Sequence, residues 1–273
     1  MIGAIASVQL GSALATKLFE RAGPGGTVLL RLVSASVVLT VLGRPRLRGL
    51  ARRELVLVGA FGVVLAGMNL SFYGALHRIP LGIAVTIEFV GPLAVAVGGS
   101  RRRMDFLWAA FAALGIFALT HGQARGLSGL GIAFALIAGG FWGGYILLNA
   151  RLGRAFAGGT GLALAMCVAS VVALPVGVAQ GGSHLLEPGV LLLGSAVGML
   201  SSAIPYSLEL EALRRIGPPV FGVLMSLEPA VAALAGLIVL GQGLGARSVA
   251  GIALVVLASI GASRRARQAP VAM

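Results

Sequence analysis

Apolar residues fill this chain in ten long runs, which short polar segments separate. A helix needs about 20 apolar residues to cross a bilayer, within a range of roughly 17 to 25. The runs have this length and are continuous, without the alternation of a membrane-spanning strand. They predict an all-α integral membrane protein whose ten transmembrane helices cover approximately residues 2–19, 26–43, 55–74, 81–99, 105–121, 129–149, 160–180, 189–210, 218–240 and 247–263.

The first five runs are related to the last five by an internal repeat. Residues 75–79 (ALHRI) are echoed 137 positions later by residues 212–216 (ALRRI), and at the same offset Pro92 falls on Pro229. Because five crossings are an odd number, the second copy has the opposite orientation in the membrane. Inverted repeats of this kind are typical of secondary transporters. The sequence therefore predicts two inverted five-helix repeats, residues 1–125 and 126–273.

Arginine is distributed unequally between the two sides of the predicted bundle. Loops that follow the even-numbered runs contain fifteen arginines, whereas the opposite loops contain four. Cytoplasmic loops are enriched in Lys and Arg, so both termini are expected in the cytoplasm. Lys17 and Arg31 lie inside or at the ends of runs, and we expect them to reach the interface by snorkelling. No basic region precedes the first run, so no removable signal peptide is predicted.

Composition excludes several classes of protein. The chain is 58% hydrophobic and 11% charged, against about 25% charged residues in soluble domains. The net charge of +13 does not indicate nucleic-acid binding, because the charges form short clusters between apolar runs. The three histidines share no metal-ligand spacing, and no nucleotide-binding or nucleophile motif is present. We therefore expect no metal, no cofactor and no enzymatic activity.

Three carboxylates fall inside apolar runs, namely Glu88, Glu209 and Glu228. A charge at mid-membrane costs several kcal/mol, roughly 2.5–3.5 on insertion scales, so these groups should face a cavity or a partner. Pro92 cannot donate to the carbonyl of Glu88, four residues earlier, and Pro229 disfavours helical geometry at Glu228. Broken helices near mid-membrane form ion and substrate sites in many transporters. The alternative is a proline kink with a structurally hydrogen-bonded Glu.

Other polar side chains share these runs. Asn69 and Tyr73 lie on one helical face at i,i+4 spacing, and Pro205 frees the carbonyl of Ser201 beside Tyr206. Hydrogen bonding between helices is the alternative role for them. The predicted substrate-binding residues are Asn69, Tyr73, Glu88, Tyr206, Glu209 and Glu228, with helix breaks at Pro92, Pro205 and Pro229. Trp142 and Tyr145 either line the same cavity or, as we favour, pack as aromatic side chains.

Five segments together resemble a known family: residues 68–73 (MNLSFY), 79–85 (IPLGIAV), 88–96 (EFVGPLAVA), 202–209 (SAIPYSLE) and 225–230 (MSLEPA). They are similar to the EamA-type branch of the drug/metabolite transporter superfamily, and within it to threonine/homoserine exporters. The resemblance implies ten helices in two inverted repeats and a central cavity lined from helices one, three, four, six, eight and nine. One departure is Gln242, where many relatives have Glu.

The resulting expectation is a secondary exporter of threonine- or homoserine-like amino acids in the bacterial inner membrane. Alternating access between the repeats would move the substrate, and protons are the expected coupling ion, with Glu88 or Glu228 as the carrier. One alternative is another cargo, such as an aromatic amino acid, a drug or a sugar-like metabolite. The other is a non-transporting membrane scaffold or sensor. A membrane enzyme is the weakest alternative, because no paired nucleophile and base is found.

Overall fold

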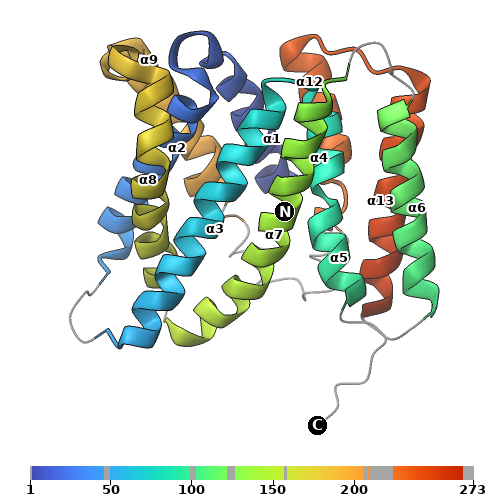
Figure 1. The fold of residues 1–273 in the computed structure, drawn as a ribbon, viewed down its shortest axis with the longest axis horizontal. Coiled ribbons are helices and arrows are strands. Elements are labelled where there is room, and N and C mark those ends of the chain that lie inside the picture. Colours follow the sequence, from blue (N-terminus) through green and yellow to red (C-terminus); the bar gives the residue numbers. More distant parts are fainter. Residues whose placement is uncertain are drawn as a thin grey trace.

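Helices form nearly all of the computed structural model, and the part of the chain that it describes has no strand (Figure 1). The described residues are 2–45, 50–98, 103–121, 127–156, 159–205, 208 and 224–266. The helices are α1 (Ile2–Thr16), α2 (Phe19–Gly43), α3 (Arg52–Leu76), α4 (Leu81–Glu88), α5 (Val90–Gly98), α6 (Arg103–His121), α7 (Gly129–Ala155), α8 (Thr160–Gly181), η1 (Gly182–Leu186), α9 (Pro188–Gly198), η2 (Met199–Ala203), α12 (Glu228–Leu240) and α13 (Ala246–Ala266).

Ten apolar helical segments lie one for one on the ten predicted runs. Four are long and apolar enough to cross a membrane by length and composition, namely α2, α3, α7 and α8 continued through η1. The six shorter ones are Ile2–Thr16, Leu81–Val95, Leu107–Ala118, Pro188–Ala203, Glu228–Leu240 and Ala246–Gly261. The prediction of an all-α protein with ten apolar helices is therefore confirmed.

The second helix differs from its prediction. It begins at Phe19 rather than at residue 26, and it kinks at Gly23, whose φ of 65° and ψ of 167° only glycine adopts readily. Pro24 follows and has no N–H to donate. The helix restarts at this point because the side chain of Gln180, in α8, accepts a hydrogen bond of 2.7 Å from the Gly25 N–H. Residues in the middle of α2 therefore lie deeper in the bundle than the predicted boundary implied.

Helices from the two halves of the chain pack against each other throughout the bundle. In Figure 1, α6 and α13 stand together at one edge, and α2, α8 and α9 lie at the other. Further contacts join α3 to α7 and α8, α4 to α12, and α1 to α12 and η2. Glycines allow close approach, which is how helices associate in lipid; a Cβ on Gly62 of α3 would lie 2.6 Å from Val168 of α8.

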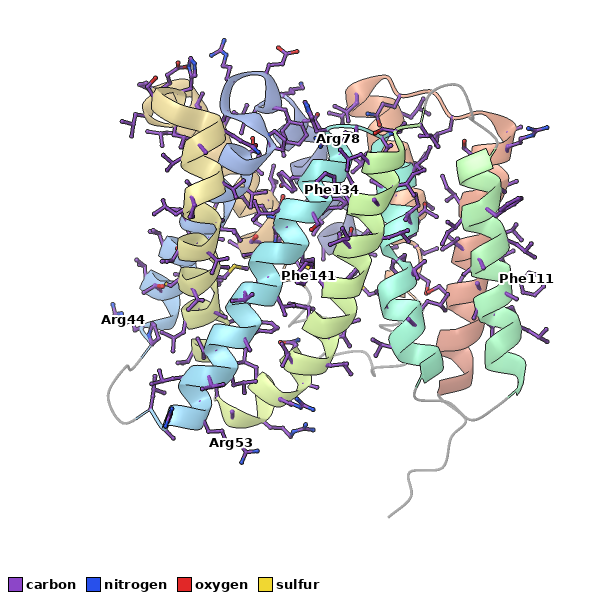
Figure 2. The ribbon with its side chains drawn as sticks, in the orientation of Figure 1. Arg44, Arg53, Arg78, Phe111, Phe134 and Phe141 are labelled. Atoms are coloured by element: carbon purple, nitrogen blue, oxygen red, sulfur yellow. The ribbon has the colours of Figure 1, made fainter. Side chains whose placement is uncertain are left out.

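The outer surface of the bundle is apolar between two polar ends. Large apolar side chains such as Val41, Leu192 and Ile238 are 66%, 75% and 78% exposed, an arrangement that suits lipid rather than water. Figure 2 shows Arg44 and Arg53 at one end of the bundle and Arg78 at the other. Charged side chains at both ends, with an apolar surface between them, are what a protein that spans a membrane requires.

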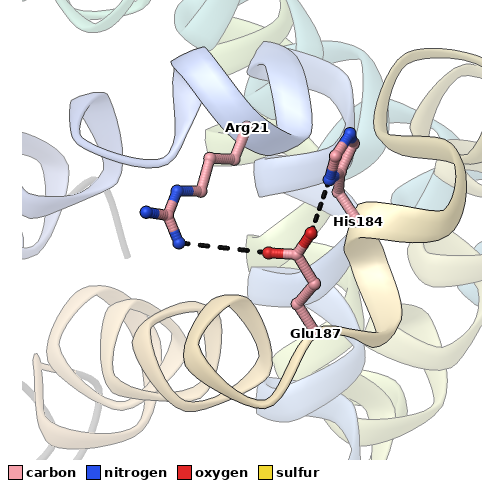
Figure 3. Close-up of polar contacts among 3 residues, drawn as sticks. All are labelled: Arg21, His184 and Glu187. Atoms are coloured by element: carbon pink, nitrogen blue, oxygen red, sulfur yellow. Dashed lines mark hydrogen bonds and ion pairs between the residues drawn. The ribbon is translucent and has the colours of Figure 1, made fainter.

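A small surface network holds the beginning of α2 against the turn before α9 (Figure 3). Glu187 lies 3.9 Å from Arg21 and 2.6 Å from the Nδ1 of His184. All three side chains are at least 42% exposed, and exposed ion pairs contribute only about 0–1 kcal/mol. The network therefore has little weight in the stability of the fold.

Candidate functional site

A cavity of about 140 Å³ lies between the helices of the two halves. This is the volume of roughly five molecules of liquid water. Its walls come from α1, α2, α3, α4, α7, η2 and the residues next to η2 and before α12. The lining residues are Val8, Gln9, Ser12, Arg31, Met68, Asn69, Phe72, Val85, Glu88, Trp142, Tyr145, Ser201, Pro205, Met225 and Glu228. Charged and amide side chains therefore converge on a space enclosed by apolar helices.

The two carboxylates of the cavity stand at helix interruptions. Glu88 is the last residue of α4 and is 7% exposed; the helix is then interrupted for one residue, Phe89, before α5 begins. Glu228 is the first residue of α12, is 8% exposed, and follows a turn at residues 226–227. Helix termini leave backbone groups without intrahelical partners, so each carboxylate stands beside polar backbone at an interruption.

The break after Glu88 is packed tightly against α7. A Cβ on Gly139 of α7 would lie 2.7 Å from the Glu88 carbonyl oxygen, and a Cβ on Gly91 would overlap the Gly139 carbonyl. Pro92, the third residue of α5, has no N–H to donate to that Glu88 carbonyl. The glycines thus permit the α7 backbone to cover the break, which fixes the position of Glu88.

The short helix α1 connects the second carboxylate to the π-helical turn η2. Gln9 is 1% exposed, and its Nε2 donates a hydrogen bond of 3.1 Å to Glu228 Oε1. The Ser7 hydroxyl donates to the Leu200 carbonyl at 2.7 Å. These contacts hold α1 between α12 and η2, so that one face of α1 forms a wall of the cavity.

Arg31 brings a positive charge to the same cavity, and the prediction that it snorkels to the interface is wrong. It lies midway along α2 and is 8% exposed. Its Nη1 donates to the Tyr73 hydroxyl at 3.1 Å and its Nη2 to the Ser201 carbonyl at 3.2 Å, while the guanidinium lies 5.5 Å from the centre of the Tyr73 ring. A π-helical turn weakens the regular backbone ladder, and here it presents a carbonyl to Arg31.

The other predicted site residues are placed as follows. Asn69 and Pro205 line the cavity, and Asn69 Nδ2 donates to the Leu65 carbonyl at 2.8 Å. Tyr73 lies behind Arg31 and is fully buried, but it does not line the cavity. Tyr206 and Glu209 fall outside the described residues. Pro229 is the second residue of α12.

Two aromatic side chains of α7, Trp142 and Tyr145, combine both of the roles that the sequence left open. Trp142 packs edge-on against Phe89 with ring centres 5.4 Å apart, and Tyr145 stacks on Phe61 at 5.1 Å. Both also line the cavity. Sequence reasoning did not select Arg31 or Gln9 as site residues; the signal available for each was a polar side chain inside an apolar run.

Membrane-crossing helices that break around a buried, charged cavity are the architecture of a secondary transporter, and the comparisons with known proteins agree. Residues 129–264 match the EamA-like transporter family. Over 98% of its length the chain is 42% identical to the threonine/homoserine exporters RhtA of Salmonella typhimurium strain LT2 and of Escherichia coli K12, covering 91% of each. A solved crystal structure shares the fold, with a TM-score of 0.63 at 20% identity over 98% of this chain and 97% of its own. The chain belongs to the EamA-like transporter family and is a multi-pass membrane transporter, not an enzyme.

Proposed function

We propose that this transporter exports small amino acids such as threonine and homoserine across the bacterial plasma membrane. The observation that carries the proposal is the 42% identity, over nearly the whole chain, to threonine/homoserine exporters. The cavity supports it, because about 140 Å³ suits a small polar molecule, whereas pockets for drug-sized ligands measure about 300–1,000 Å³. Opposite charges around one small space also suit a zwitterion better than an apolar drug or a sugar.

The transport mechanism in this proposal is alternating access between two inverted repeats, residues 1–125 and 126–273. Its main support is the pairing of the helices. The second helix of one half packs on the second helix of the other (α2 on α8), and the fourth and fifth do the same (α4 on α12, α6 on α13). The first helix of each half packs on the third of the other, α1 on α9 with η2 and α7 on α3. A twofold axis between the halves produces this set of pairs.

The helix interruptions support the same symmetry. The break at Phe89 and the turn at Ser226 are 137 residues apart, which is the offset of the sequence repeat, and Pro92 and Pro229 follow them at that same offset. With five crossings in each half, the repeats are inverted. The proposal places both termini in the cytoplasm, because the arginine-rich loops belong there. Lipid then surrounds the apolar exterior of the bundle.

Proton coupling is the second part of the proposal, with Glu88 and Glu228 as the carriers. Glu88 interacts electrostatically with both Glu228 and Arg31, so the cavity holds two carboxylates and one guanidinium. Once an amino acid with no net charge has left, one negative charge remains in excess. A proton is the smallest cation that neutralises it, and buried ionisable residues in membrane helices commonly form proton relays.

Transport in proteoliposomes tests this function. Vesicles containing the purified protein and labelled L-threonine should lose label faster when an inward proton gradient is imposed. Glu88→Gln and Glu228→Gln should each remove the response to the gradient, whereas Glu187→Gln, at an exposed carboxylate, should behave as wild type. Transport of aromatic amino acids in preference to threonine would contradict the cargo. A response to the gradient that survives in the Glu88→Gln, Glu228→Gln double variant would contradict the carriers.

A further inference from the structure

Among the described residues, no opposite charge lies within ion-pairing distance of the buried Arg31 side chain. The described residues contain ion pairs only at the surface, between Arg21, His184 and Glu187. Glu88 and Glu228 line the same cavity as Arg31. A buried charge carries a large desolvation penalty unless it is paired and fully hydrogen-bonded. Arg31 therefore presents an electrostatic site for an anion on the cavity wall.

Hydrogen-bond donors of Arg31 remain available for that anion. A guanidinium has five N–H groups, and two are engaged, by Tyr73 and by the Ser201 carbonyl. The Nε has no partner in the described part of the chain, and the hydroxyls of Ser12 and Ser201 have none there either. All three residues line the cavity, and Gly11 packs directly on Ser201. The cavity lining thus carries three donor groups, one guanidinium N–H and two hydroxyls, that have no partner among the described residues.

From this geometry we infer that Arg31, with the hydroxyls of Ser12 and Ser201, forms the subsite for the substrate's α-carboxylate. The inference rests on the proposed export of amino acids and deepens it. Arginine suits the task because its planar donors match a carboxylate in two-point contact. The subsite requires a free carboxylate on every substrate, whatever its side chain.

Other residues of the cavity lining have the complementary chemistry. Glu228 accepts from Gln9, and the Oε1 of Gln9 has no donor among the described residues. These oxygens, with Glu88, form an acceptor-rich region for the α-ammonium group. An amino acid bound between the two regions would pair its carboxylate with Arg31 and its ammonium group with an acceptor, so a ligand that lacks either charge should bind more weakly.

Tyr73 and the Ser201 carbonyl act as positioning groups in this scheme. They fix two N–H groups of Arg31, while the Nε has no partner among the described residues. Tyr73 does not line the cavity, so it does not touch the substrate. Its ring lies 5.8 Å from Phe19 and 5.9 Å from Phe72, which holds the hydroxyl in place.

A combination of variants and substrate analogues tests the subsite. Binding of labelled L-threonine to the purified full-length protein is measured in competition with unlabelled L-threonine, L-threoninamide and homoserine lactone. The last two keep the amine but lack the carboxylate. Wild type should bind them about 30- to 100-fold more weakly than threonine, the effect of removing one charge-assisted, buried contact. In Arg31→Gln, the affinity for threonine should fall by a similar factor, while the affinity for threoninamide should change less than about threefold. Arg31→Lys keeps the charge without the planar fork, so its affinity for threonine should lie between those of wild type and Arg31→Gln.

Two results would overturn the subsite. One is an Arg31→Gln variant that loses threoninamide binding as strongly as threonine binding, because that pattern indicates a structural role. The other is a wild type that binds threoninamide as tightly as threonine, which decides the matter even if Arg31 variants fail to fold. Either result leaves amino-acid export standing. Carboxylate dependence for other amino acids, with no binding of threonine or homoserine, would support the subsite and overturn the proposed cargo.

Discussion

Replacing Gly139 by alanine tests the packing that holds the helix break at Glu88. The added Cβ would lie 2.7 Å from the Glu88 carbonyl oxygen, whereas the closest ordinary C–H···O contacts between helices measure about 3.3 Å. Helix α7 must therefore move away from the break by more than half an ångström. Overpacking of this kind costs about 1–3 kcal/mol, and the higher helix propensity of alanine returns only about 0.5–1 kcal/mol. We expect Gly139→Ala to lower the free energy of unfolding by roughly 0.5–2 kcal/mol.

The neighbouring glycine provides a matched control. A Cβ on Gly140 meets no atom within 4 Å, so Gly140→Ala should be neutral or gain up to about 1 kcal/mol. Thermal unfolding of the two purified variants in the same detergent measures the difference, which should be about 1–3 kcal/mol in favour of Gly140→Ala. Transport by Gly139→Ala should also fall, because Glu88 moves. Equal stability of the two variants would refute the close contact between α7 and the α4–α5 break.

Three further predictions concern individual side-chain contacts. Gln242 Oε1 accepts a hydrogen bond of 3.0 Å from the Leu81 N–H at the start of α4. Gln242→Leu should therefore lower the unfolding free energy by about 0.5–2 kcal/mol, whereas Gln242→Glu keeps the acceptor and should leave it unchanged. A thermal unfolding measurement in which Gln242→Leu is as stable as Gln242→Glu would contradict this cap. Gln9→Leu removes the donor to Glu228 and should lower the unfolding free energy by about 1–3 kcal/mol, and threonine counterflow should become slower. Unchanged counterflow would show that the Gln9–Glu228 hydrogen bond has no role in transport. Glu187→Ala should change stability by less than about 1 kcal/mol, and a larger loss in the same melt would contradict the minor weight given to the surface network.

The helical segments were predictable because a single physical length defines them. The thickness of the hydrocarbon sets how many apolar residues a crossing needs, so the ten runs could be counted without knowing any contact. Two of the interruptions lie next to prolines. The break at Phe89 lies three residues before Pro92, and the turn at residues 226–227 lies directly before Glu228 and Pro229. Both follow from the missing N–H and the ring of proline.

Arg31 was misjudged because the start of its helix was misplaced. The predicted run begins at residue 26, after the charged residues Glu20 and Arg21, which places Arg31 near its outer end. The helix starts at Phe19 and tolerates these charges at its first turn, which puts Arg31 midway along it. The kink at Gly23 depends on Gln180, 155 residues away, and the local sequence gave no sign of that contact.

Gln9 was missed for a different reason. Its position inside an apolar run was clear, but the direction of its side chain was not. Helix α1 has almost no preference for one face in its sequence, since small and apolar residues surround Gln9 on every side. Its orientation comes from packing against α12 and η2 and from a hydrogen bond to Glu228, 219 residues away. Such contacts belong to the assembled bundle, and no local periodicity encodes them.

The central claim is that the substrate occupies the cavity between Arg31, Glu88 and Glu228, and a single cysteine can test it. Cys167 is the sole cysteine of the chain, so Cys167→Ala gives a background without thiols. Val8→Cys then places one thiol on the cavity wall, at a half-buried residue with no role in the proposed subsite. In proteoliposomes, a small methanethiosulfonate reagent should modify this thiol and block threonine flux, and saturating threonine should slow the modification at least tenfold. Modification at the same rate with and without threonine, or full flux from the modified protein, would contradict the account.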